Sequence, residues 1–303
     1  MRYYSHGKLL LSGEYVVLDG AISLAIPTKY GQSLVVEPID EPNLIWQSYD
    51  EKSAIWFENT FPITEITSGF SSSLDEISNT LIHILKSAKQ LNPSFLNSTQ
   101  GYLVKTRLDF PRQWGLGTSS TLINNIANWV QIDAFQLLKL TFGGSGYDIA
   151  CAQHNQPITY QIKDDVQLVN EVNFNPRFKE HLYFVYLNKK QNSREGIAKY
   201  NTHKTSSIEV IQDISDITSK LISCQSLSEF ELLLKTHETI IANIIKQQPI
   251  NEILFSDFPG SIKSLGAWGG DFILATSKDN PSEYFKTKGF KIVIPYKNMI
   301  FKP

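Results

Sequence analysis

Apolar positions recur along the chain with two periods, which predict helices in some stretches and strands in others. Apolar residues return every three or four positions in the predicted helices, at residues 73–91, 133–142, 206–224 and 227–247. β-Branched and aromatic residues between turn residues predict strands at 6–18, 21–27, 30–39, 43–49, 53–57, 101–110, 157–162, 166–172, 182–187 and 289–295. Residues 30–57 are expected to form an antiparallel meander. The pattern is that of a globular protein with both kinds of element.

A glycine-rich loop at residues 111–121, Pro-Arg-Gln-Trp-Gly-Leu-Gly-Thr-Ser-Ser-Thr, runs directly into a further helical pattern. One face of that helix is apolar and consists of Leu122, Ile126, Trp129 and Val130. The loop glycines therefore lie at a helix N-terminus, where the first N–H groups have no partner within the helix and the macrodipole leaves partial positive charge. Such an end binds phosphate, or it is an ordinary cap formed by Thr118 or Ser119.

The loop does not match either of the common nucleotide-binding patterns. The P-loop sequence G-x-x-x-x-G-K-[ST] is absent, and Ser120 occupies the position of the third glycine in the dinucleotide pattern. A nucleotide bound at this loop would therefore be bound by a motif other than these two.

Composition and charge narrow the functional class. The chain has 303 residues, of which 42% are hydrophobic, so it can bury one large core or two moderate ones. Lys and Arg total 28 against 30 for Asp and Glu, which disfavours a nucleic-acid partner. No apolar run approaches the roughly 20 residues of a membrane span, and the N-terminus lacks a signal-peptide core, so we expect a cytoplasmic protein with no membrane partner. Cys151 and Cys224 are expected to be buried thiols.

Four other stretches carry candidate chemistry. Lys8 lies between a glycine and three leucines and is followed by Glu14, and each is either a surface charge or a ligand-binding group. Asp148 follows a glycine-serine turn and could cap a helix, accept a proton or hold a metal. A cationic segment at residues 188–194 ends in Arg194 and is either a solvated loop or a substrate-binding element. A third glycine turn, at 264–276, leads into a strand.

Three motifs in this order resemble those of the GHMP kinase superfamily, which includes galactokinase, homoserine kinase, mevalonate kinase and phosphomevalonate kinase. They are Gly-Lys at 7–8 with Glu-Tyr at 14–15, Trp-Gly-Leu-Gly-Thr-Ser-Ser at 114–120, and Gly-Ala-Trp-Gly-Gly-Asp at 266–271. The string Gly-Tyr-Asp-Ile-Ala at 146–150 is also similar to the signature of a bacterial branch of the superfamily. Within the superfamily the motifs are most similar to those of mevalonate and phosphomevalonate kinases, and Gly-Ser-Gly-Tyr-Asp at 144–148 and Asp271 after two glycines are similar to phosphomevalonate kinases.

The resemblance implies an α+β fold of two domains. Residues 1–175 would form a ribosomal-protein-like α/β domain with the phosphate loop, and residues 176–303 a ferredoxin-like domain. The linker between them is expected at residues 173–176. The implied activity is transfer of a phosphoryl group from ATP, with Mg²⁺, to a small metabolite, for which mevalonate or phosphomevalonate is expected. The partner is thus a small-molecule substrate, and the oligomeric state, a homodimer included, is left open.

The resemblance also implies roles for individual residues. Asp148 would be the catalytic carboxylate, with Lys8 stabilising charge beside it, and Ser119 would reach Mg²⁺. The ATP phosphates would be bound by Gly115, Leu116, Gly117, Thr118, Ser119 and Ser120. The substrate side would be formed by Glu14, Tyr15, Arg194, Gly269 and Gly270, with Lys189 and Lys190 as further candidates for an anionic acceptor.

Two departures from the family pattern support an alternative. The stretch Gln-Leu-Leu-Lys at 136–139 lacks the glutamate metal ligand of mevalonate kinases, and Trp268 occupies a position that is normally glycine. The second hypothesis is therefore a catalytically silent protein with the same fold that binds a nucleotide or a metabolite.

Overall fold

The computed structural model describes residues 1–68, 75–97, 100–202 and 207–301, and divides the chain into two compact units. Unit 1 consists of Met1–Gly7, Tyr30–Arg112 and Gly117–Gln153, and unit 2 of Lys8–Lys29, Gln113–Leu116 and His154–Pro303. The boundaries fall inside strands β1 (Arg2–Ser12) and β2 (Ser23–Ile39), inside the glycine-rich loop and after Gln153. The expected domain division at residue 175 stays a prediction.

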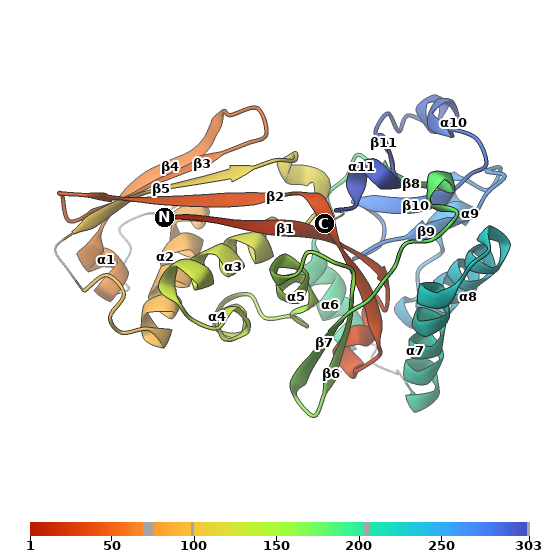
Figure 1. Ribbon diagram of the computed structural model, residues 1–303, viewed down its shortest axis with the longest axis horizontal. Coiled ribbons are helices and arrows are strands. Elements are labelled where there is room, and N and C mark those ends of the chain that lie inside the picture. Colours follow the sequence, from red (N-terminus) through yellow and green to blue (C-terminus); the bar gives the residue numbers. More distant parts are fainter. Residues whose placement is uncertain (69–74, 98–99, 203–206, 302–303) are drawn as a thin grey trace. The chain divides into compact units, whose positions relative to one another are not determined.

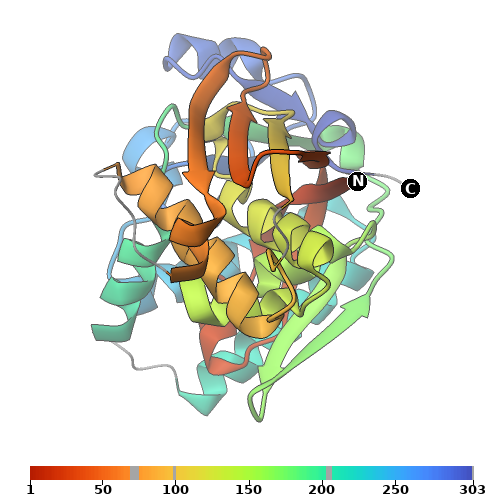
Figure 2. The same ribbon diagram turned by 90° about the vertical axis from the view of Figure 1, so that its left-hand side faces the viewer.

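Unit 1 is a layer of strands with helices on one face (Figures 1 and 2). Its strands, in spatial order, are β4 (Ile55–Pro62), β3 (Asn43–Tyr49), β5 (Gly101–Leu108) and the second half of β2. The first part of β1 also belongs to unit 1, and β1 pairs with β2. Its helices are α1 (Ile63–Ser68), α2 (Glu76–Leu91), α3 (Thr118–Val130), α4 (Ala134–Thr141) and α5 (Tyr147–Gln153). The core between the layers is apolar and includes Val36, Trp46, Leu85, Ile123 and Ile126.

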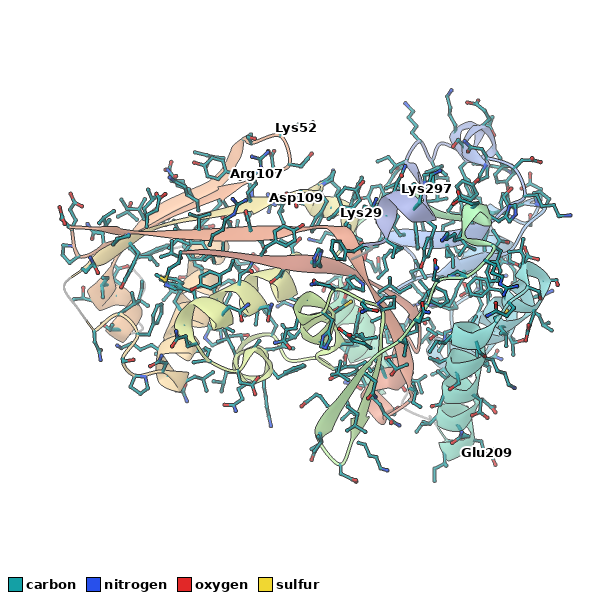
Figure 3. The ribbon with its side chains drawn as sticks, in the orientation of Figure 1. Lys29, Lys52, Arg107, Asp109, Glu209 and Lys297 are labelled. Carbon is teal, nitrogen blue, oxygen red and sulfur yellow. The ribbon has the colours of Figure 1, made fainter. Side chains whose placement is uncertain are left out.

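The expected meander over residues 30–57 is only partly right. β3 and β4 pair antiparallel as predicted, and Asp50 closes their turn by accepting hydrogen bonds from the backbone N–H groups of Lys52 and Ala54; Lys52 is labelled at this turn in Figure 3. β5 lies between β3 and β2, parallel to β3 and antiparallel to β2. A pairing between strands so distant in the sequence leaves no local signal, so the pattern of residues 30–57 could not reveal it.

The other predicted elements differ from the structure mainly at their ends. The strands expected at 21–27 and 30–39 form one strand, β2, because Pro27 is compatible with an extended backbone. The apolar run expected to continue as a strand to residue 18 ends at Ser12, and Val16–Asp19 forms a 3₁₀ turn, η1. In α2, Ile77 is exposed although its spacing predicts burial. Ser73 and Leu74, where this helix was expected to begin, lie outside the described residues.

Unit 2 contains a four-stranded antiparallel sheet in the order β11 (Val293–Pro295), β8 (Leu182–Tyr186), β10 (Phe272–Thr276), β9 (Ile262–Ser264). The helices between β8 and β9 are α6 (Ser193–Thr202), α7 (Ile208–Ser223), α8 (Leu227–Ile245) and α9 (Ile250–Leu254), and α10 (Ser282–Thr287) joins β10 to β11. Numbered along the chain, the strands lie in the order 4-1-3-2, which is the expected ferredoxin-like arrangement.

The remaining described strands of unit 2 belong to the sheet that contains β2 and not to that four-stranded sheet. The first half of β2 pairs with β6 (Ile158–Lys163), which pairs with β7 (Val166–Glu171). Three short elements are η2 (Arg112–Trp114), which straddles the boundary between the units, η3 (Lys179–His181) and α11 (Tyr296–Met299). α7 and α8 pack against each other, and α8 packs against β9 (Figure 1). This packing brings α8 beside the strand that leads into the third glycine turn.

Candidate functional site

The start of α3 in unit 1 has the features that the glycine-rich loop predicts. The helix begins at Thr118, and its cap, Gly117, has a left-handed backbone with φ 93° and provides no side-chain hydrogen bond. By contrast, α2 and α4 are capped by the carboxylates of Asp75 and Asp133. The N-terminal N–H groups of α3 are therefore not covered by a capping side chain, and an anion could accept hydrogen bonds from them.

The hydroxyl residues of this turn differ in exposure. Ser119 is exposed and Thr118 is half-buried, whereas Ser120 is buried. The Thr121 hydroxyl donates a 2.8 Å hydrogen bond to Gln32 Oε1 on β2, which fixes the first turn of α3 on the unit 1 sheet. Of the predicted phosphate-binding hydroxyls, Ser119 is thus the one most open to a ligand or metal ion.

Asp148 lies in the first turn of α5, in the same unit as α3, and is half-buried. α5 packs against α3, and the Gln153 side-chain amide donates a 3.1 Å hydrogen bond to Asn124 Oδ1 of that helix. Unit 1 therefore holds both the predicted phosphate-binding helix and the predicted catalytic carboxylate on two helices in contact.

The first part of the glycine-rich loop is anchored in unit 2. Trp114 packs edge-on against Phe272, with ring centroids 5.4 Å apart, and the Tyr186 hydroxyl donates to the Gln113 carbonyl. The backbone N–H of Lys8 donates to the Leu116 carbonyl at 3.0 Å, and Leu116 itself is buried. Lys8 of the first motif is thus held next to the loop by the main chain.

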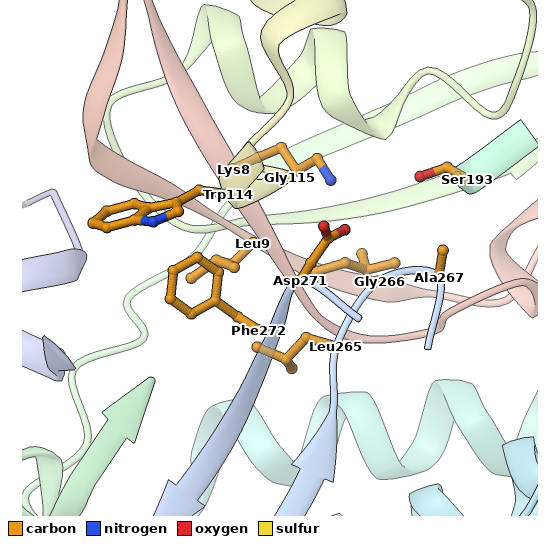
Figure 4. A pocket seen from close by; sticks show the side chains of 11 residues that line it. Lys8, Leu9, Trp114, Gly115, Ser193, Leu265, Gly266, Ala267, Asp271 and Phe272 are labelled. Carbon is orange, nitrogen blue, oxygen red and sulfur yellow. The ribbon is translucent and has the colours of Figure 1, made fainter. Parts of the chain in front are cut away.

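A pocket in unit 2 brings together parts of all three motifs (Figure 4). Lys8, Gly115, Ser193 and Asp271 provide its polar wall. The Lys8 ammonium, the Ser193 hydroxyl and the Asp271 carboxylate point towards a common space in Figure 4. The pocket's remaining lining is Leu9, Leu10, Trp114, Leu265, Gly266, Ala267 and Phe272.

Asp271 is held in a constrained position in the pocket. Its backbone has a left-handed φ of 51°, and its carboxylate accepts a hydrogen bond from the Gln191 N–H at 3.1 Å. A Cβ on Gly115 would lie 2.2 Å from the Asp271 Cγ, so only glycine allows this approach. Burial raises the pKa of the Asp271 carboxyl, and the Gln191 N–H and the Lys8 and Lys190 ammonium groups oppose that rise.

The predicted substrate-binding residues do not all line this pocket. Gly269 and Gly270 belong to the turn before Asp271, where a Cβ on Gly270 would lie 2.8 Å from the Lys189 carbonyl. Arg194 is exposed near the start of α6, a helix that the sequence did not predict. Trp268 is buried in an apolar cluster that includes Tyr15 and Tyr200, and it is not one of the residues that line the pocket.

Glu14 and Tyr15 are both buried in unit 2. The Glu14 carboxylate forms an ion pair with Lys263 at 2.5 Å. The Tyr15 hydroxyl donates to the Ala267 carbonyl at 2.8 Å, and burial with the nearby Glu14 charge raises the Tyr15 pKa to about 12. Their contacts with substrate stay a prediction, and their observed contacts are with the protein itself.

The sequence analysis missed Lys263, His237 and Glu238, which surround Glu14. A signal was present, since His237 and Glu238 interrupt the apolar face of α8 formed by Phe230, Leu234 and Ile241. Lys263 likewise lies in a strand whose residues are all buried. Polar side chains at such positions are rarely buried unless they are paired.

No group of three or more His, Cys, Asp or Glu side chains within the described residues could hold a metal ion. The stretch at 136–139, where the resemblance implies the glutamate ligand of mevalonate kinases, lies in α4, and its Leu137 and Leu138 are in the core. Ser119 fits as one ligand of a Mg²⁺ ion, because this ion commonly keeps water and substrate phosphates as its other ligands. Among the described helices, none combines the length and apolar character needed to cross a bilayer.

Comparison with known proteins gave matches among solved structures only. No protein-family model matches the chain, and no curated protein sequence does. Mevalonate kinase from Methanococcus jannaschii is 15% identical, with TM-score 0.68, covering 95% of this chain and 94% of its own. Phosphomevalonate kinase from Streptococcus pneumoniae, in complex with phosphomevalonate and AMPPNP, is 13% identical, with TM-score 0.68 and 95% of each chain covered.

A sugar kinase shows the same likeness. Galactokinase from Lactococcus lactis, complexed with galactose, is 12% identical, with TM-score 0.66, covering 95% of this chain and 88% of its own. These enzymes belong to the superfamily that the three glycine motifs resemble, and the likeness extends over nearly the whole chain. The protein therefore has the fold of the GHMP kinases.

Proposed function

We propose that the protein is an ATP-dependent kinase of a small metabolite, with mevalonate or phosphomevalonate as the acceptor to test first. The observation that carries the proposal is the N-terminus of α3, which follows the left-handed Gly117 and has no side-chain cap. The fold shared with small-molecule kinases supports phosphoryl transfer, and the motif resemblance to phosphomevalonate kinases supports the choice of acceptor.

In the proposed reaction the first N–H groups of α3 and the Ser119 hydroxyl bind the phosphates of ATP. The acceptor hydroxyl oxygen forms a bond to the γ-phosphorus as the bond to the bridging oxygen of ADP breaks, and the hydroxyl proton passes to the Asp148 carboxylate. The Lys8 ammonium stabilises negative charge on the transferred group. A Mg²⁺ ion held in part by Ser119 would neutralise phosphate charge. These tasks are positioning and electrostatic stabilisation, which phosphoryl transfer mainly requires.

The test is ADP formation from ATP and Mg²⁺ with a panel of acceptors, namely mevalonate, phosphomevalonate, homoserine and galactose. We expect turnover with one of the first two. Turnover with only homoserine or galactose would support the proposed kinase activity and reject mevalonate and phosphomevalonate as the acceptor.

The alternative, a silent binding protein, is favoured by the missing glutamate ligand in α4. Such a protein would show an upward shift of its thermal unfolding midpoint with ATP but form no ADP with any member of the panel.

A further inference from the structure

Unit 2 contains four ionisable side chains that are withdrawn from solvent, here called the buried charge cluster: Glu14, His237, Glu238 and Lys263. Lys263 and His237 are 0% exposed, Glu14 is 1% exposed and Glu238 is 3% exposed. They come from the first motif, from α8 and from β9. None of them lines the pocket that contains Lys8 and Asp271.

The cluster holds the turn of the first motif. The Gly13 N–H donates to His237 Nε2 at 2.9 Å, and the Glu14 carboxylate contacts the Lys263 ammonium. Directly after Gly13 the backbone makes a tight turn over residues 14–16. In this turn the Val16 N–H donates to the Glu14 carbonyl at 2.7 Å, and Tyr15 has φ 63° and ψ −52°. A three-residue turn with positive φ is strained and persists only where its surroundings fix it.

The same cluster holds the strand that enters the third glycine turn. Glu238 accepts hydrogen bonds from the Ser264 N–H at 3.0 Å and from the Ser264 hydroxyl at 2.7 Å. The Lys263 ammonium donates to the Ser264 carbonyl at 2.8 Å. The next three residues, Leu265, Gly266 and Ala267, line the pocket. The Tyr15 hydroxyl also donates to the Ala267 carbonyl. The turn of the first motif and the third glycine turn are therefore linked both by the buried charge cluster and by this hydrogen bond.

The protonation of His237 follows from its contacts. Its Nε2 atom accepts the Gly13 N–H, so the proton of the neutral ring lies on Nδ1. Nε2 is also 3.4 Å from a Glu14 oxygen, but a protonated Nε2 would leave the buried Gly13 N–H without an acceptor. Burial and the neighbouring Lys263 charge lower the His237 pKa well below its ordinary value, in agreement with the neutral ring. The close charge pair is therefore Glu14 with Lys263.

Stability by itself does not account for such a cluster. A buried ion pair can often be replaced by apolar side chains of similar volume with no loss of stability, because desolvation offsets the attraction between the charges. What apolar side chains would not reproduce is the set of directed contacts to the Gly13 N–H, the Ser264 N–H and the Ser264 carbonyl.

We propose that Glu14, His237, Glu238 and Lys263 are positioning residues that fix the turns at 13–15 and 265–271, and thereby fix the pocket wall for phosphoryl transfer. The catalytic part of this inference rests on the proposed kinase function. The part that concerns the turns does not, and it can be measured without turnover.

The first test removes the charge pair at nearly constant volume. In the double variant Glu14→Met/Lys263→Met we expect a thermal unfolding midpoint close to that of the unmodified protein. We also expect kcat to fall by about tenfold to a hundredfold, as displacement of catalytic geometry by an ångström does, with ATP affinity unchanged. Lys235→Met, which removes an exposed lysine from α8, is the matched control and should change neither. A double variant that folds and keeps its kcat would overturn the proposal.

The second test retains the charge pair and changes His237 only. His237→Gln keeps a side-chain acceptor for the Gly13 N–H, whereas His237→Leu removes it. Hydrogen exchange followed by mass spectrometry should show faster exchange in the peptides covering residues 13–15 and 264–271 in the Leu variant only. The kcat should fall in the Leu variant and recover in the Gln variant. Equal exchange in the His237→Leu and His237→Gln variants would reject the positioning role. This second test therefore decides the proposal even if the Glu14→Met/Lys263→Met variant fails to fold.

The two proposals fail in different ways. If the unmodified protein forms no ADP with any acceptor while the Leu variant still exchanges faster at both turns, the kinase function is wrong and the role of the cluster in fixing the turns stands. If the unmodified protein turns over and the Leu variant exchanges faster but keeps its kcat, the kinase function stands and the cluster is only structural.

Discussion

The start of α3 and the turns next to the buried charge cluster are both glycine turns, yet they are held in opposite ways. The chain before α3 is anchored by apolar packing of Trp114 and Leu116, and no side chain caps the helix. At the other two turns, the N–H groups of Gly13 and Ser264 are occupied by His237 and Glu238. The proposed function explains the difference: N–H groups that are proposed to bind a ligand are left open because packing holds the chain before them, whereas the N–H groups of a turn that supports the pocket wall are used for hydrogen bonds within the protein.

The largest expected effect concerns Asp148 on α5, the helix that packs against α3. If the protein is the kinase proposed above, Asp148→Ala should nearly abolish ADP formation while leaving ATP binding largely intact, because in that proposal the phosphates bind to the start of α3 and not to Asp148. A loss of about a thousandfold in kcat is within the range for removal of a general base. ADP formation and calorimetric ATP affinity are the measurements. Asp148→Asn keeps the size of the side chain and should be similarly inactive, and turnover at the unmodified rate would contradict the assignment.

The cluster should make stability depend on pH. Burial raises the pKa of Glu238 from 4.5 to about 7. The folded protein therefore binds a proton more tightly than the unfolded chain, and this contribution is present at low pH and lost as the pH rises from about 4.5 to about 7. The loss is about 3 kcal/mol of unfolding free energy.

Glu238→Gln carries no charge at any pH and should remove that dependence. Relative to the unmodified protein, its free energy of unfolding should rise by about 3 kcal/mol between pH 4.5 and pH 8. Urea denaturation across this range is the measurement, and Glu209→Gln, at an exposed position on α7, is the control (Figure 3). Parallel pH profiles for Glu238→Gln and the unmodified protein would show that Glu238 does not titrate as inferred.

A smaller effect tests the packing of the loop. Gly115→Ala places a Cβ against the Asp271 carboxylate at a residue with φ 67°. Gly143→Ala has nearly the same φ, 66°, with no atom within 4 Å of its added Cβ. Both variants lose about 1–2 kcal/mol to backbone strain, and Gly115→Ala should lose about 1–3 kcal/mol more through the clash.

Denaturant titration of both variants isolates the clash, because the backbone strain is common to them. ATP affinity should fall only in Gly115→Ala. Equal losses of stability in the two variants would show that the carboxylate moves aside readily.

The smallest effect concerns the capped helices. Asp133→Ala removes the carboxylate that accepts from the Phe135 and Gln136 N–H groups, and should cost about 1 kcal/mol of stability without changing turnover. Asp75→Ala at α2 is the matched variant. Chemical denaturation measures the stability, and the ADP assay measures the turnover. A large loss of turnover would show that these caps influence more than the stability of their own helices.

Local pattern was enough wherever one element buries its own face. The helical spacing of Ile126, Trp129 and Val130 placed α3, and a glycine before it placed the helix start, because both signals lie within a few residues. The ferredoxin-like half was implied by motif resemblance, and the strand order 4-1-3-2 agrees with it.

Long-range contacts were beyond the reach of pattern. The position of β5 between β2 and β3 depends on pairing between strands that lie far apart in the sequence. Glu14 looked like a substrate ligand because its partner Lys263 is 249 residues away. α6 was missed because its sequence is polar and only Tyr200 is buried.

By itself, the sequence determined most of the helices and strands that have an apolar face, where the glycine turns fall and which family the motifs resemble. These properties depend on neighbouring residues and on backbone conformations that glycine permits. Only the tertiary structure decided that Asp271 lies against Gly115 and that Glu14 is enclosed with Lys263, His237 and Glu238. The physical reason is that the charge state and exposure of a side chain are set by what packs around it, and those neighbours come from distant parts of the chain.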